Sequence, residues 1–115
     1  IVEMTKEAFQ ASGGSLEVMN DPKEACQGSN VIYTDTWVSM GESKGDKGIE
    51  NFAPYQVNSE LMSWAADGAI FMHCLPAHRN EEVTDEIMDS DISVVFDQAE
   101  NRMHVQKAIL LDLLK

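Results

Sequence analysis

The sequence predicts an α/β fold: a three-layer, partial Rossmann-like domain with a parallel sheet of about four strands and helices on both faces. Short runs of apolar and β-branched residues alternate along the chain with segments of helical periodicity. These apolar runs end abruptly in polar or glycine-containing corners, as strands of a buried parallel sheet do. With 115 residues, the chain has the size of one domain.

In the first half of the chain, we expect two helices, two strands and a loop. Residues 1–11 carry apolar side chains at helical spacing, and Gly13-Gly14 ends this helix. The short apolar run 16–19 is predicted to be a strand. Asp21-Pro22 supplies a cap and a first-turn proline for a helix that stops near Gly28. Residues 31–34 are β-branched and aromatic, which predicts a second strand, and glycine-rich residues 41–48 predict a loop.

The second half repeats the alternation of helix and strand. A helix from about residue 58 to 66 is closed by Asp67-Gly68, and the apolar run 69–73 follows as the third strand. A short helix around 82–88 leads to a fourth strand at 92–96. The last helix is expected from about 99 to 114, because Asp97 and Glu100 have capping-box spacing.

Composition excludes several classes of function. The chain has 8 basic and 20 acidic residues, a net charge of -12, and no basic cluster that could bind nucleic acid or an anionic membrane surface. The acidity is interpreted as a solvated surface, although a site for a cationic substrate would look similar. No apolar stretch is long enough to span a bilayer. The first residues also lack the basic and then apolar pattern of a signal peptide. Two widely spaced cysteines suit a reducing compartment, so a cytoplasmic location is expected.

Polar residues follow the second and third strands, where an open α/β sheet binds its ligands. Asp35 lies one residue past strand 31–34, where it could bind a ligand ammonium group or cap the following turn. Ser39 and Met40 begin the glycine-rich loop, which could fold over a ligand or be an ordinary surface loop.

Cys74 directly follows the third strand, between His73 and His78. A Cys/His nucleophile, or a metal site made of His73, Cys74 and His78, is conceivable. Because the segment offers at most three ligands without a zinc-binding spacing, no metal is predicted. On chemistry alone, a buried structural thiol is favoured.

Arg102 lies near the start of the last helix, where free backbone N–H groups already favour anions. An arginine there suits a phosphate or a developing oxyanion. The alternative is a surface ion pair with Glu100, which is equally compatible with the sequence.

Three motifs together resemble the ornithine-binding half of ornithine carbamoyltransferases. They are Asp-Thr-Trp-Val-Ser-Met-Gly at 35–41, His-Cys-Leu-Pro-Ala-His-Arg at 73–79 and Glu-Asn-Arg at 100–102. Aspartate carbamoyltransferases have a similar motif with proline at the position that corresponds to Cys74. Relatives that use putrescine or acetylated ornithine generally lack the Asp…Ser-Met-Gly run, so the resemblance favours ornithine itself.

The resemblance implies transfer of a carbamoyl group from carbamoyl phosphate to the side-chain amine of L-ornithine, giving L-citrulline and phosphate. Asp35, Ser39 and Met40 would bind ornithine. Cys74, Leu75 and Arg102 would bind carbamoyl phosphate, with Cys74 and Arg102 acting in catalysis and no covalent intermediate. No cofactor is implied.

The family's phosphate-binding Ser-x-x-Thr-Arg element, which belongs to a separate N-terminal domain, does not occur in these residues. The first strands of the ornithine domain are also missing. We therefore expect a single incomplete ornithine-binding domain over residues 1–115, inactive alone. The parent family is trimeric, and edge pairing could make this chain a dimer. The alternative is a stand-alone α/β amino-acid-binding or assembly module.

Overall fold

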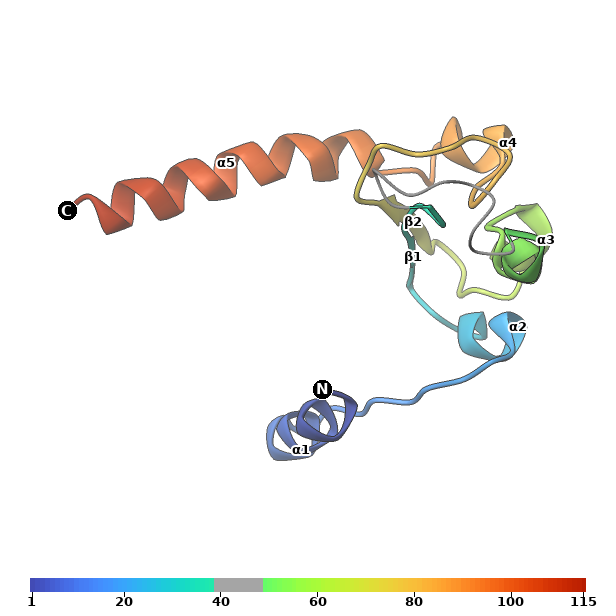
Figure 1. Ribbon diagram of the computed structural model, residues 1–115, viewed down its shortest axis with the longest axis horizontal. Coiled ribbons are helices and arrows are strands. Elements are labelled where there is room, and N and C mark those ends of the chain that lie inside the picture. The colour runs from blue at the N-terminus through green and yellow to red at the C-terminus, as the bar shows by residue number, and fades with distance from the viewer. Residues whose placement is uncertain (39–48) are drawn as a thin grey trace.

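The computed structural model describes residues 1–38 and 49–115, in which short helices lie beside a small parallel sheet and two longer helices extend away from it (Figure 1). In chain order the elements are α1 (Val2–Ser12), α2 (Pro22–Cys26), β1 (Val31–Thr34), the 3-10 helix η1 (Ile49–Tyr55), α3 (Ser59–Met62), β2 (Ile70–His73), α4 (Asp85–Met88) and α5 (Val95–Leu113). The α/β class and all five predicted helices are confirmed, three of them shorter than expected.

Strands β1 and β2 form the sheet and run parallel, with Thr34 opposite His73. Both strands therefore end at the same edge, which brings Asp35 and Cys74 to adjacent positions. The predicted number of about four strands is wrong for the described ranges, where the sheet has two. The expected three-layer arrangement stays a prediction.

The predicted strand at residues 16–19 is absent. This segment has no strand pairing, and its Val18 side chain is 71% exposed. An apolar run alone does not make a strand, because the backbone also needs a neighbouring strand with which to pair.

The predicted strand at 92–96 is reduced to one parallel bridge, between Ser93 and Phe71. The Phe71 N–H donates to Ile92 O at 2.8 Å, and Phe71 O accepts from Val94 N–H at 3.0 Å. Helix α5 begins directly afterwards at the fully buried Val95. This apolar run therefore serves mainly as the first turn of a helix, an ambiguity that periodicity cannot resolve in so short a segment.

The hydrophobic core lies between β2, α3, α4 and the start of α5. Its buried members are Cys26, Ile32, Val57, Leu61, Phe71, Val83, Ile87, Met88 and Val95. Two polar side chains, His73 and Glu82, are fully buried beside it.

Helices α1 and α5 project from this body (Figure 1). Helix α1 has no buried residue and ends, as predicted, at Gly13 in the left-handed conformation (φ 77°). Within α5, Val95 alone is buried, and several apolar side chains along the rest of the helix are exposed. None of the helices in the described ranges is long and apolar enough to cross a membrane.

Candidate functional site

Asp35 and Cys74 meet where β1 and β2 end. The Cys74 thiol donates a hydrogen bond of 2.8 Å to Asp35 Oδ1, and this oxygen also accepts the Thr36 backbone N–H at 2.7 Å. Parallel pairing in the Thr34–His73 register makes this contact possible, because each residue follows directly after its strand.

The protonation states of this pair follow from its surroundings. The hydrogen bonds from the Cys74 thiol and the Thr36 N–H lower the pKa of Asp35, so its carboxylate is ionised. Burial first, and then the hydrogen bond to Asp35, raise the pKa of the Cys74 thiol. Since the thiolate is the nucleophilic form, these surroundings disfavour covalent catalysis by Cys74 and suit a neutral hydrogen-bond donor.

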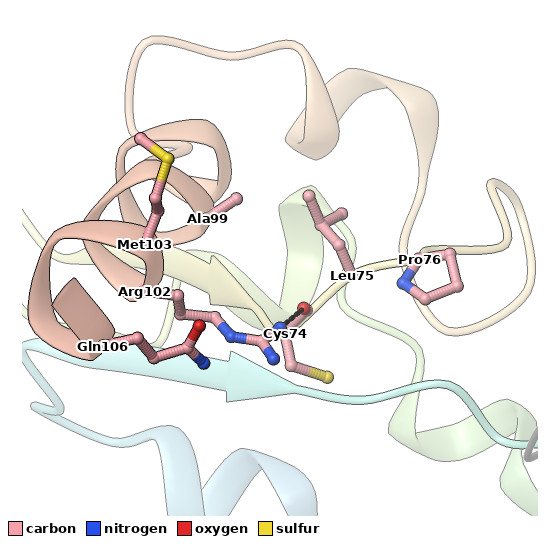
Figure 2. Close-up of a pocket in the computed structure, with 7 residues that line it drawn as sticks. All are labelled: Cys74, Leu75, Pro76, Ala99, Arg102, Met103 and Gln106. Atoms are coloured by element: carbon pink, nitrogen blue, oxygen red, sulfur yellow. Dashed lines mark hydrogen bonds between the residues drawn. The ribbon is translucent and has the colours of Figure 1, made fainter. Parts of the chain in front are cut away.

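An open cleft of about 610 Å³ lies next to Cys74, between the loop after β2 and helix α5 (Figure 2). It is lined by Cys74, Leu75, Pro76, Ala99, Arg102, Met103 and Gln106. Arg102 reaches from α5 towards the loop, with its Nη1 3.4 Å from Cys74 O. Glu100 instead pairs with His104 at 3.3 Å, so the alternative pairing of Arg102 with Glu100 does not form. The guanidinium group therefore lies at the cleft.

The backbone of Leu75 is held in an unusual conformation, with a φ of 56°. Its N–H donates to His73 Nδ1 at 2.8 Å. Within the described ranges, no donor forms a hydrogen bond with the Leu75 carbonyl oxygen. This carbonyl is therefore available to an N–H group in the cleft.

A buried layer of side chains, which no sequence pattern indicated, supports the loop from behind. Because His73 Nδ1 accepts from Leu75, its Nε2 carries the proton and donates to Glu82 Oε1 at 3.2 Å. The same carboxylate oxygen accepts the His78 backbone N–H at 2.5 Å. His73 and Glu82 thus fix both ends of the segment that carries Cys74 and Leu75.

Other contacts tie this loop to its neighbours. Thr36 Oγ1 lies 2.9 Å from His78 Nδ1, which links the segment after β1 to the loop after β2. Arg79 pairs with Asp85 at 2.9 Å and with Asp89 at 2.6 Å. These hydrogen bonds from Arg79 lower the pKa values of both carboxyl groups.

Of the predicted site residues, Asp35, Cys74, Leu75 and Arg102 come together at one edge of the sheet. Ser39 and Met40 lie outside the described residues. The conceivable metal site at His73, Cys74 and His78 is not formed. In the described part of the chain, the donors that could hold a metal converge at His78, Glu81 and Glu82.

Residues 1–113 match the family described as "Aspartate/ornithine carbamoyltransferase, Asp/Orn binding domain". The chain belongs to this family. It is 57% identical over 103 residues to an ornithine carbamoyltransferase of Methanospirillum hungatei and 53% identical over 113 residues to one of Archaeoglobus fulgidus. The structure is similar to ornithine carbamoyltransferase from Pyrococcus furiosus, with a TM-score of 0.88, 50% identity, and coverage of 95% of this chain and 35% of that one.

This carbamoyltransferase-family chain spans about a third of the length of its curated relatives. The alignments cover 89% of it and 34% of the Methanospirillum protein, and 97% of it and 36% of the Archaeoglobus protein. The Asp35–Cys74–Arg102 edge lies within the matched domain.

Proposed function

We propose that this chain forms the ornithine side of a carbamoyl-transfer site, in which the side-chain amine of L-ornithine attacks carbamoyl phosphate to give L-citrulline and phosphate. The observation that carries the proposal is the 2.8 Å contact between Asp35 and Cys74, because Cys74 lines the same cleft as Arg102. An ammonium-binding carboxylate and a cation for developing negative charge thus share one sheet edge.

On the ornithine side, the ionised Asp35 is the partner for the substrate α-ammonium group. Ser39 and Met40 complete this part of the proposed site. The neutral Cys74 thiol lies beside the reacting amine and orients it. In these roles the protein positions the substrate and stabilises charge, and it forms no covalent intermediate.

On the carbamoyl side, Leu75 O accepts an N–H of the carbamoyl amide and Arg102 faces the carbonyl oxygen. Attack forms a C–N bond and places negative charge on that oxygen, where a guanidinium stabilises it. The C–O bond to phosphate then breaks, and the leaving phosphate takes up the proton that the attacking nitrogen loses. Loss of a single oxyanion donor typically lowers kcat by about 10²–10³-fold.

We further propose that residues 1–115 act as one ornithine-binding domain and do not turn over on their own. The support is chemical: these residues contain no Ser-x-x-Thr-Arg element with which to bind the phosphate group. Cys26 and Cys74 are both free thiols, which are typical of proteins in a reducing compartment, and this supports a cytoplasmic location.

A chimaera tests the proposal without relying on the isolated chain. The matching segment of the Pyrococcus furiosus enzyme is replaced by this chain, and citrulline formation is measured. We expect activity, and we expect Asp35→Asn to raise the KM for ornithine by about 10–100-fold, as loss of a charged hydrogen bond does. Asp67→Asn is the matched control, because Asp67 precedes β2 and lies away from the site edge. A folded but inactive chimaera, or equal effects of both substitutions, would contradict the proposal.

A second candidate function is a stand-alone assembly module that closes its sheet by dimerisation. Its support is the outer edge of β1, which pairs with no strand in the described ranges and exposes Val31 and Tyr33. Light scattering after size exclusion should give a defined dimer of the 115-residue chain. A monomer or a broad aggregate would contradict this alternative.

A further inference from the structure

Glu82 is a fully buried carboxylate with only one of its two oxygens satisfied. Oε1 accepts from His73 Nε2 and the His78 backbone N–H, whereas Oε2 has no hydrogen-bond partner. A buried carboxylate in this state is energetically costly, because its charge is compensated on one side only. The unsatisfied oxygen therefore indicates a missing positive partner.

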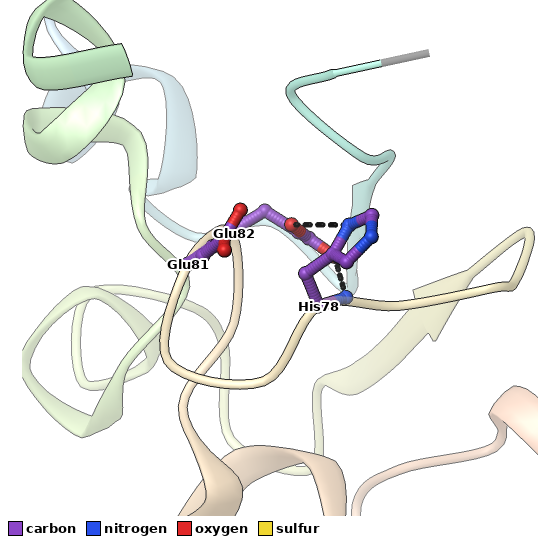
Figure 3. Close-up of side chains that lie close together, drawn as sticks. All are labelled: His78, Glu81 and Glu82. Carbon is purple, nitrogen blue, oxygen red and sulfur yellow. Dashed lines mark hydrogen bonds and ion pairs between the residues drawn. The ribbon is translucent and has the colours of Figure 1, made fainter. Parts of the chain in front are cut away.

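Two further donor side chains converge on this carboxylate. One ligand atom each from His78, Glu81 and Glu82 lies within 4.8 Å of the other two. Figure 3 shows the His78 ring directed at the Glu82 carboxylate, and Nδ1 lies 3.9 Å from Oε2. That separation is too long for a hydrogen bond but suits two ligands bound to one ion, each about 2.0–2.2 Å from it.

We propose that His78, Glu81 and Glu82 bind a divalent transition-metal cation, with Zn²⁺ as its representative. One imidazole and two carboxylates are ligands that zinc and its neighbours accept, whereas Mg²⁺ and Ca²⁺ prefer oxygen alone. His78 and Glu81 are partly exposed, so an ion can reach them from solvent, while Glu82 is anchored by its two hydrogen bonds.

The proposed ion lies behind the loop and apart from the cleft. Binding through His78 Nδ1 replaces its contact with Thr36, whose hydroxyl keeps Val38 O as a partner at 3.1 Å. Cys74 is directed at Asp35 instead. The cation is therefore coordinated by nitrogen and oxygen only, which distinguishes this site from a thiolate site.

The test uses Co²⁺ and Zn²⁺ with the metal-free 115-residue chain. We expect one equivalent of Co²⁺ to give visible ligand-field bands without the near-ultraviolet band of a cobalt–thiolate bond, and Zn²⁺ to displace it. His78→Ala and Glu81→Gln should each weaken Zn²⁺ binding at least about tenfold in calorimetric titration. Both replace partly exposed side chains, and circular dichroism checks that the variants keep their helices.

Two control variants separate this site from other sources of binding. His104→Ala removes the exposed histidine that pairs with Glu100 at 3.3 Å on α5, and it should leave binding unchanged. Cys74→Ser should also bind normally. The proposal is overturned if no stoichiometric binding occurs, if Cys74→Ser abolishes it, or if His78→Ala binds as tightly as the original chain.

Discussion

Glu82 accepts a 3.2 Å hydrogen bond from His73 Nε2, and both side chains are fully buried behind the loop that carries Cys74. The opposite ring nitrogen of His73 accepts the Leu75 N–H at 2.8 Å. Glu82 therefore fixes the imidazole ring, and the ring in turn fixes the backbone of Leu75. A leucine with φ of 56° is strained, so the conformation needs such support.

Replacing Glu82 by alanine should destabilise the chain by about 2–5 kcal/mol, because the buried His73 Nε2 and the partly buried His78 N–H both lose their acceptor. The measurement is urea unfolding followed by circular dichroism, with a chelator present so that bound cations do not contribute. Glu86→Ala is the matched control, since Glu86 is an exposed acid on α4, and should change stability by less than about 0.5 kcal/mol. A loss no larger than that of the control would show that Glu82 does not support the loop.

The reactivity of Cys74 should depend on Asp35. Because burial and the Asp35 hydrogen bond raise the pKa of this thiol, alkylation of the original chain should be slow at neutral pH and accelerate only in alkaline solution. Asp35→Asn removes the negative charge, lowers the Cys74 pKa and should speed alkylation at mildly alkaline pH. Mass mapping distinguishes Cys74 from Cys26, and Asp67→Asn controls for loss of one charge. Identical pH profiles for both variants would refute the coupling.

The candidate site was predictable from sequence to the extent that it depends on strand ends. Residues that follow a buried parallel strand reach the binding edge, and Asp35 and Cys74 do so in the register of β1 and β2. Glu82 was not predictable in this way. An acidic residue at the start of a predicted helix is normally exposed. Glu82 is buried because the chain turns back after β2 and brings its carboxylate within 3.2 Å of His73 Nε2.

The fold was predictable where local signals and tertiary pairing agree. The prediction of a strand at residues 92–96 failed because, in the described ranges, this segment pairs with a strand only at Phe71 of β2 before α5 begins. The side chain of Gln98 then takes the role of a neighbouring strand. Its Oε1 accepts the His73 N–H at 3.1 Å, and its Nε2 donates to the Tyr33 hydroxyl at 3.3 Å. A side-chain substitute for backbone pairing has no periodic signature in sequence.

Arg79→Gln should make the stability of the chain less sensitive to acid. Arg79 lowers the pKa values of Asp85 and Asp89 in the folded state. A carboxyl group with a lowered folded pKa adds stability above its unfolded pKa of about 4, and this stability is lost as pH falls through the folded value. The variant should therefore be less stable at neutral pH, with the difference shrinking in acid.

Urea unfolding at neutral and acidic pH measures this difference. Lys107→Gln removes one positive charge from the exposed surface of α5 and should show no comparable pH-dependent difference. If the loss caused by Arg79→Gln were the same at every pH, the ion pairs with Asp85 and Asp89 would not be its cause.

Arg102→Gln should lower kcat in the chimaera by about 10²–10³-fold and leave the KM for ornithine nearly unchanged. The proposed reason is that Arg102 stabilises negative charge on the carbonyl oxygen, which develops only during attack, whereas Asp35 binds ornithine. Arg102→Lys keeps a positive charge without the planar fork and should recover part of the rate. Lys107→Gln, farther along α5, should leave both constants unchanged. A higher KM for ornithine with an unaltered kcat would instead assign Arg102 to substrate binding, and the proposed division of labour between Asp35 and Arg102 would be wrong.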